Sequence, residues 1–244
     1  MLAAHFPRSP MRIPFAFLLA FPLILAAGES SAAEPKKAQT TVVDLHNQAG
    51  HDAVLRRGDG WVTVGMVEEE LPVTVDLKNG FLEWSDEGTG GGTRKVQSAL
   101  FRTADRLSLL VSFSALFDGV GVGGTLTVHE QREGKMVPAD ERLPRPAPAA
   151  FLTDAGAPLA QQHPDWLEHL GVLYTLPRVG TTIVATLDQT FAHLKLRELP
   201  EAERAAREAF LDEAFHASIE LTFDKKAGKF SLGRKGAAAK RPGK

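Results

Sequence analysis

The stretch VTVDLKNGFLEW, residues 73–84, decides the fold class because apolar and polar residues alternate on both sides of a turn signal. Asn79-Gly80 is the preferred pair for a two-residue type I′ turn, in which both residues have positive φ. That turn would place Val75 opposite Trp84 on neighbouring antiparallel strands. The apolar residues of both strands would then share one buried face. They are Val73, Val75, Leu77, Leu82 and Trp84.

The same two-residue period recurs along the chain and predicts further antiparallel strands. They are expected at residues 96–102, 107–114, 126–128, 172–176, 181–187, 219–223 and 230–232. A helix is expected over 200–215, where Pro200 begins the segment and the acidic Glu201 and Glu203 follow in its first turn. The predicted fold class is therefore mainly β (α+β), an antiparallel meander or sandwich with one clear helix.

The first 33 residues have the order of features found in a secretory signal peptide. Arg8 and Arg12 precede an uncharged run over residues 13–27, and Ser31-Ala32-Ala33 fits the small-x-small cleavage rule. The run is shorter than the roughly 20 apolar residues that a membrane-spanning helix needs. We therefore expect cleavage before Glu34, a periplasmic or secreted product, and no transmembrane segment after cleavage.

Composition predicts the organisation of the exported chain. Residues 34–40 are expected to be a linker, 41–233 a single β-rich domain with a Pro-rich loop at 138–158, and 234–244 a disordered basic tail. The chain contains no cysteine, so neither disulfides nor a thiolate zinc site can form. Stability must then come from burial of the core.

The net charge of the chain limits the kinds of partner that it can bind. Residues 34–224 contain 18 Lys and Arg against 29 Asp and Glu, a net charge of 18 − 29 = −11. A protein that binds nucleic acid needs a basic footprint, so this balance argues against that class. The eight basic residues after Asp224 could make weak contact with an anionic surface. An unknown protein or an envelope polymer is the partner we expect.

Five short motifs carry a resemblance to other proteins. They are NGFLEW at 79–84, GGG at 90–92, ALFR at 99–102, LPRVGTTI at 176–183 and GKF at 228–230. With them, the run from Gly80 to Leu232 resembles an uncharacterised group of secreted or lipoprotein β-domains of Gram-negative bacteria, with the helix near Pro200 as an insertion. The resemblance implies a β fold and export, and it implies no activity.

The predicted hairpin register supplies the candidate site residues. It places Asp76 opposite Glu83. Two carboxylates that lie so near each other can hold a divalent cation or serve acid–base chemistry. Lys78 on the same face would instead neutralise the pair and leave an ordinary solvated surface. A hydrolase or cation site built from scattered carboxylates is the alternative to a binding protein. Its candidate residues are Asp76, Glu83, Asp86 and Asp118.

Other catalytic and metal-binding patterns are weak. The sequence has no G-x-S-x-G or S-x-x-K motif for a nucleophilic serine. Ser108, Ser112 and Ser114 alternate with apolar residues, as solvent-facing strand residues do. No histidines have the helical spacing of metal ligands, so only a zinc site assembled from distant histidines stays open. We therefore predict no catalytic residue and no cofactor, and a non-enzymatic binding domain.

Overall fold

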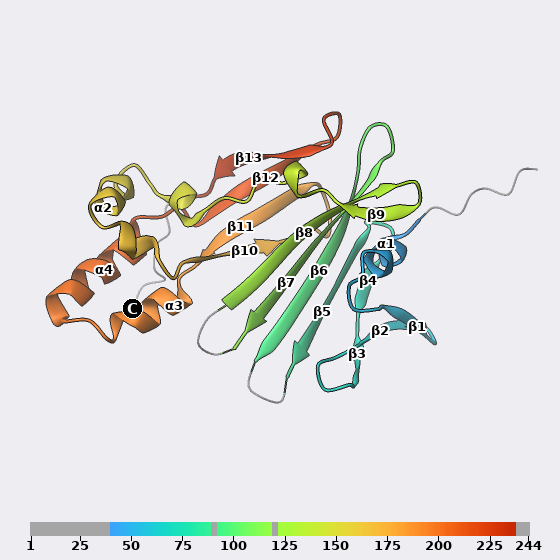
Figure 1. Cartoon of the computed structure of the whole chain (residues 1–244), viewed down its shortest axis with the longest axis horizontal. Coiled ribbons are helices and arrows are strands. Elements are labelled where there is room, and N and C mark those ends of the chain that lie inside the picture. The colour runs from blue at the N-terminus through green and yellow to red at the C-terminus, as the bar shows by residue number, and fades with distance from the viewer. Residues whose placement is uncertain (1–39, 89–91, 119–121, 238–244) are drawn as a thin grey trace, which may run out of the picture. The chain divides into compact units, whose positions relative to one another are not determined.

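The computed structural model describes residues 40–88, 92–118 and 122–237, which belong to one compact unit beginning at Gln39. The predicted signal peptide lies outside the described residues. Three antiparallel sheets make up most of the described chain (Figure 1). The prediction of a mainly β, antiparallel fold is confirmed.

The largest sheet is a six-stranded meander in which each strand pairs with the next along the chain. Its strands are β4 (Thr74–Asp76), β5 (Phe81–Glu87), β6 (Thr93–Arg102), β7 (Ser108–Phe117), β8 (Val122–Arg132) and β9 (Lys135–Pro138). Glu133 and Gly134 join β8 to β9 as a two-residue turn with φ values of 49° and 79°. Positive φ at both central residues is the requirement of a type I′ turn.

A four-stranded meander follows the Pro-rich segment. Its strands are β10 (Gly171–Thr175), β11 (Thr182–Asp188), β12 (Ser218–Asp224) and β13 (Lys229–Lys235). The predicted final hairpin is confirmed, because Phe223 pairs with Phe230 and Leu221 pairs with Leu232. β13 also includes Arg234, which pairs with Glu220 at 2.7 Å, so the strand enters the stretch that composition assigned to the tail.

Helices gather at one end of this second sheet (Figure 1). The predicted helix is α4 (Glu201–Glu213), which begins directly after Pro200 as the sequence indicates. The sequence did not predict α2 (Gly156–Gln162) or α3 (Thr190–Leu196). Three 3-10 turns lie between β9 and β10, namely η1 (Asp140–Arg142), η2 (Pro148–Phe151) and η3 (Pro164–Leu167).

The N-terminal part of the described chain forms a third, smaller layer. It consists of α1 (Val42–Gln48) and a three-stranded sheet of β1 (Leu55–Arg57), β2 (Gly60–Val64) and β3 (Glu70–Pro72). Thr41 caps α1 in a capping box, with its hydroxyl accepting from the backbone N–H of Asp44 while the carboxylate of Asp44 accepts from the backbone of Thr41. Such a reciprocal pair satisfies two backbone donors at the start of a helix.

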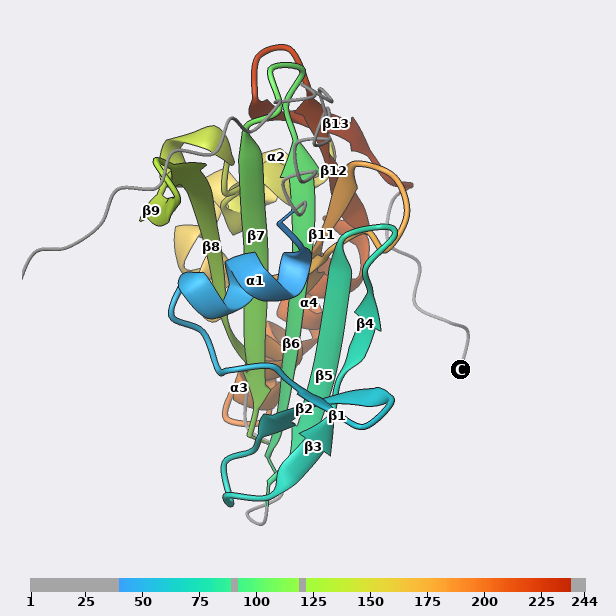
Figure 2. The same ribbon diagram turned by 90° about the vertical axis from the view of Figure 1, so that its right-hand side faces the viewer.

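Successive residues of a strand point to opposite faces of the sheet. Both faces of the six-stranded sheet are covered, so side chains on each face are buried. One face carries Phe101, Val111 and Phe113, which share a core with the four-stranded sheet and α4. The other face carries Leu82 and Leu110, which share a second core with α1. Figure 2 shows α1 lying across the strands of this second face.

This cover explains why one sequence prediction was wrong. Ser112 was expected to face solvent, but it is 5% exposed and Ser98 beside it is fully buried. Both point to the face of the sheet that α1 and the segment after it cover. Alternation alone showed which residues share a face, and it did not show that both faces are covered.

The predicted register of the first hairpin was also wrong. β4 pairs with β5 so that Asp76 lies opposite Phe81 and Val75 opposite Leu82. The connection therefore has four residues, from Leu77 to Gly80, in place of two. Leu77, expected in the core, is 49% exposed.

The side chain of Asp76 accounts for the wider turn. Its carboxylate accepts hydrogen bonds from the backbone N–H of Asn79 at 3.1 Å and from the Asn79 side chain at 2.9 Å. Such local bonds from an Asp side chain compete with strand pairing and favour a turn. Gly80 alone in this connection has positive φ, at 68°, so the turn is not type I′.

Candidate functional site

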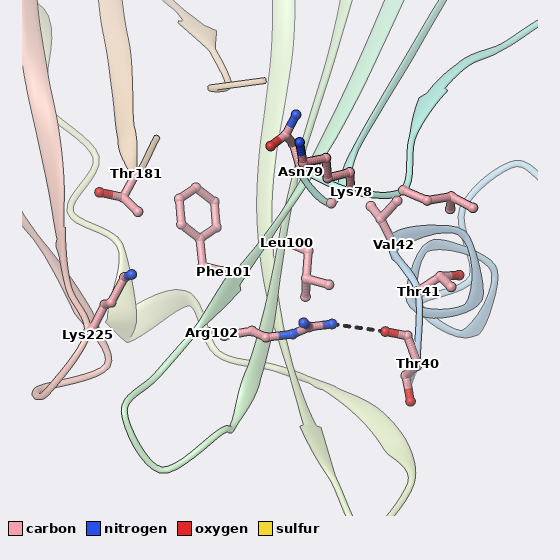
Figure 3. A pocket seen from close by; sticks show the side chains of 12 residues that line it. Thr40, Thr41, Val42, Lys78, Asn79, Leu100, Phe101, Arg102, Thr181 and Lys225 are labelled. Carbon is pink, nitrogen blue, oxygen red and sulfur yellow. Dashed lines mark hydrogen bonds between the residues drawn. The ribbon is translucent and has the colours of Figure 1, made fainter. Parts of the chain in front are cut away.

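A pocket of about 410 Å³ lies where five segments of the chain meet (Figure 3). Its wall is formed by residues 40–42 before and at the start of α1, the connection over 77–80, and the end of β6 over 100–102. Thr181 before β11 and Lys225 after β12 complete it. The pocket thus joins the two main sheets to the N-terminal layer.

Three cationic side chains line the pocket, and no acidic residue does. They are Lys78, Arg102 and Lys225, each exposed at the surface. The surrounding chain over residues 34–224 has a net charge of −11. A concave surface of one sign concentrates ligands of the opposite charge. The pocket therefore has the electrostatics of an anion-binding site.

Neutral groups complete the wall. Thr40 and Thr181 bring hydroxyl groups that can donate hydrogen bonds to oxygen atoms. The Thr41 hydroxyl already donates to Asp44, and the Asn79 amide donates one of its two N–H groups to Asp76. The apolar part consists of Val42, Leu77, Leu100 and Phe101. Val42 and Phe101 are buried, whereas Leu77 is 49% exposed. The wall thus combines polar and charged side chains with a smaller apolar part.

The two lysines are carried on turns that aspartate side chains hold in place. Asp76 accepts from Asn79 within the turn that bears Lys78. Asp224 accepts from the backbone N–H groups of Lys226 and Ala227, at 2.8 Å and 3.1 Å, within the turn that bears Lys225. These carboxylates are engaged in their own turns.

The same bonds keep both carboxyls ionised. The hydrogen bonds from Asn79, followed by the one from Arg178, lower the pKa of Asp76. The hydrogen bonds from the backbone of Ala227 and Lys226 lower the pKa of Asp224. A carboxylate that accepts such bonds is stabilised in its charged form.

Arg102 connects the end of β6 to the segment before α1. Its guanidinium donates to the carbonyl oxygen of Thr40 at 3.2 Å (Figure 3). The guanidinium has further donors in a planar fork, which suits the oxygen pairs of carboxylate and phosphate groups. Arg102 thus positions Thr40 and carries charge at the pocket.

The structure separates Asp76 from Glu83, which the sequence predicted as a facing pair. Glu83 lies opposite Thr74 and accepts a hydrogen bond from the Gln97 amide at 3.1 Å. Asp76 accepts from Arg178, at 3.2 Å, in addition to Asn79. The cation site inferred from their direct opposition loses its geometric basis.

The other two predicted acids lie elsewhere. Asp86 is 1% exposed on the opposite face of β5, where one carboxylate oxygen accepts from the Met66 backbone N–H at 2.6 Å. Asp118 follows the end of β7. Among the described residues, no group of three or more His, Cys, Asp or Glu side chains could hold a metal ion.

Three histidines that are distant in the sequence do come together. The ring centroids of His46 and His51 are 4.9 Å apart, and those of His51 and His129 are 5.6 Å apart. The sequence left open a site assembled from distant histidines, and these three form a contact cluster without the geometry of a metal site.

No local pattern predicts the cationic pocket as a unit, because its charged residues are 24 and 123 positions apart along the chain. Within the described part of the chain, every helix is too short or too polar to cross a membrane.

Comparisons with known proteins give little further information. No protein-family model and no curated protein matches the chain. Among solved structures, a domain of an uncharacterised protein from Porphyromonas gingivalis W83 is similar, with 16% sequence identity and a TM-score of 0.47. The match covers 78% of this chain and 86% of that domain. It is a distant structural neighbour, and neither the site nor its chemistry is inferred from it.

Proposed function

We propose that this protein is an exported, non-enzymatic β-domain that binds an acidic polymer of the cell envelope through the cationic pocket. The observation that carries the proposal is the gathering of Lys78, Arg102 and Lys225 around one pocket with no acid in its wall. A protein that is acidic over most of its length has this basic concavity at the meeting point of its layers.

The composition of the pocket favours a carboxylate-bearing sugar polymer over a purely apolar ligand. Three cations can pair with successive acidic groups, while the hydroxyls and the Asn79 amide suit sugar hydroxyls. All three cations are exposed, so each pair contributes modestly and affinity depends on several of them together. Binding should therefore weaken as salt screens the charges.

The alternative was a hydrolase or a divalent-cation binder that uses the four predicted carboxylates. It has no comparable support, because those carboxylates lie on different faces and strand ends and do not converge. An acid–base or metal site requires such convergence.

Binding of polygalacturonate by isothermal titration calorimetry tests the proposal, with uncharged dextran as the ligand control. The double variant Lys78→Glu/Lys225→Glu should bind about tenfold more weakly or worse, since each reversal removes an attraction of about 1 kcal/mol and adds repulsion. Lys135→Glu is the matched control, because Lys135 is equally exposed but lies on the β8–β9 hairpin. Equal affinities of the parent and the double variant would contradict the assignment.

A further inference from the structure

The histidine cluster connects α1 to the six-stranded sheet through a buried chain of hydrogen bonds. His46 on α1 is fully buried, and its Nδ1 lies 2.9 Å from the hydroxyl of Ser98 on β6. The Ser98 hydroxyl lies 2.7 Å from that of Ser112 on β7. The other ring nitrogen of His46, Nε2, lies 3.1 Å from the carbonyl oxygen of Asp52.

These contacts determine where the proton of His46 resides. A carbonyl oxygen only accepts, so Nε2 carries the proton and donates it to Asp52. Nδ1 is then the acceptor and takes its hydrogen bond from Ser98, whose oxygen accepts in turn from Ser112. A second proton, on Nδ1, would reverse the direction of both hydroxyl hydrogen bonds. It would also put a positive charge on a fully buried side chain.

The two neighbouring histidines, His51 and His129, are half-buried, and each has a ring nitrogen that is unsuited to a proton. Nε2 of His51 and Nδ1 of His129 are buried and have no hydrogen-bond partner among the described residues. A protonated ring would therefore present an N–H without an acceptor. His46 and His51 would also repel each other if both were charged, because their ring centroids are 4.9 Å apart.

The charged groups that face the cluster are already paired. Asp52, from the segment after α1, pairs with Arg94 of β6 at 2.7 Å. Asp140 of η1 faces His129 and pairs with Arg145 at 2.7 Å. Neither carboxylate is free to neutralise a protonated imidazole fully.

The direction of the pKa shifts agrees with this geometry. Burial, followed by the charge of His51, lowers the pKa of His46 to about 4. Burial, followed by the charge of His129, lowers the pKa of His51, and burial lowers the pKa of His129. All three rings are therefore neutral at pH 7, and acid opposes the folded arrangement.

α1 is an element that this change can release. It has seven residues, and an isolated helix of that length is not stable in water, so it depends on docking. Its apolar side chains Val42, Val43 and Leu45 are buried against the sheet. Val42 also lines the cationic pocket together with Thr40 and Thr41.

We propose that His46, His51 and His129 make α1 an acid-sensitive clasp, whose protonation frees α1 from the sheet and opens the pocket wall formed by residues 40–42. The release of α1 depends only on the cluster. Its consequence, loss of bound polymer in acid, rests on the proposed function of the pocket.

Thiol labelling tests the clasp because the natural chain has no cysteine. A single cysteine at Val43→Cys, on the buried side of α1, reports release, and Ala185→Cys in the four-stranded sheet is the matched control. With a dipyridyl disulfide, which reacts in acid, the labelling rate at Val43→Cys should rise about tenfold or more between pH 6.5 and pH 4. The rate at Ala185→Cys should stay low.

Replacement of two cluster residues identifies the trigger. His51→Gln/His129→Gln, in the Val43→Cys background, should move the midpoint of labelling to lower pH. Three results would overturn the proposal: protection of Val43→Cys down to pH 4, simultaneous exposure of both reporter sites, or an unmoved midpoint in the double variant.

A second measurement separates this inference from the proposed function. Polygalacturonate that binds at pH 7 should dissociate with the same midpoint as the labelling reaction. Absence of binding at pH 7 would contradict the proposed function alone, since the labelling experiment contains no polymer. Binding that persists where α1 is labelled would refute the link between the clasp and the pocket.

Discussion

Phe210 provides the most direct test of how α4 contributes to stability. The side chain is 2% exposed and belongs to the core that the two main sheets share. Its ring centroid lies 5.2 Å from that of Trp166 and 5.1 Å from that of Phe215, and both contacts are edge-to-face. The helix therefore contributes a buried aromatic residue to the core, and Phe210→Ala removes it.

The expected loss is about 4 kcal/mol in the free energy of unfolding. Truncation of a buried Phe to Ala costs about 3 to 5 kcal/mol, and each edge-to-face pair contributes about 0.5 to 1.5 kcal/mol of that loss. Phe210 also lines a cleft of about 200 Å³ between α2 and α4. Solvent can enter a cleft more easily than a closed core, which keeps the estimate below the upper limit.

Urea unfolding followed by tryptophan fluorescence and circular dichroism measures this loss. Phe210→Leu should cost only about 1 to 2 kcal/mol and keeps the test valid if Phe210→Ala does not fold. Leu232→Ala is the control, because Leu232 is 52% exposed on β13 and its loss should change stability by less than about 0.5 kcal/mol. A loss below about 1 kcal/mol for Phe210→Ala would refute the packing of α4 against the core.

Three further outcomes are expected. The free energy of unfolding should fall by up to about 3 kcal/mol between pH 6.5 and pH 4. In that range His46 becomes protonated in the unfolded chain, whereas the folded chain disfavours its protonation. A free energy of unfolding that does not change with pH in urea titrations would contradict this. Gly80→Ala should cost about 1 kcal/mol or more in the same assay, because φ is 68° and the new Cβ would lie 3.0 Å from Leu100. N-terminal sequencing of exported protein should begin at or near Glu34, and a full-length membrane-bound product would argue against signal cleavage.

Strands were predictable where apolar and polar residues alternate and the apolar residues form one buried face of the sheet. β6 and β7 extend a few residues beyond their predicted limits, and the pairing of Phe223 with Phe230 agrees with the sequence. α4 was predictable from its start signals, Pro200 and the acidic residues after it. In each case the local pattern and the tertiary packing favour the same conformation.

Three short helices, α1, α2 and α3, were missed because local signals are weak over seven residues. α2 and α3 have no side-chain cap. α1 has a capping box, and its Thr41-x-x-Asp44 spacing is a signal that the sequence does contain. The buried histidine cluster depends on α1, so missing that helix also hid the cluster. Without a cover over the second face of the sheet, Ser112 and His129 look like ordinary surface residues.

The cationic pocket could not be predicted from the sequence for a different reason. Lys78 and Lys225 lie on turns of different sheets, and only the packing of those sheets brings them to one pocket. Each lysine beside a turn aspartate is unremarkable by itself. Long-range assembly of this kind leaves no local pattern in a single sequence.

The first hairpin shows why correct faces do not guarantee correct partners. A shift of two residues leaves the paired residues on their predicted sides of the sheet, so Leu82 and Trp84 are buried as expected, although Val75 pairs with Leu82 and not with Trp84. Leu77, which the wider turn takes out of the strand, is exposed. Asn79-Gly80 favours a tight turn, but the Asp76 side chain stabilises a wider one. The two-residue turn with positive φ at both central residues occurs instead at Glu133-Gly134. The facing carboxylates that suggested a cation site follow from the tight turn alone, and with the wider turn Asp76 helps to position Lys78 at the cationic pocket.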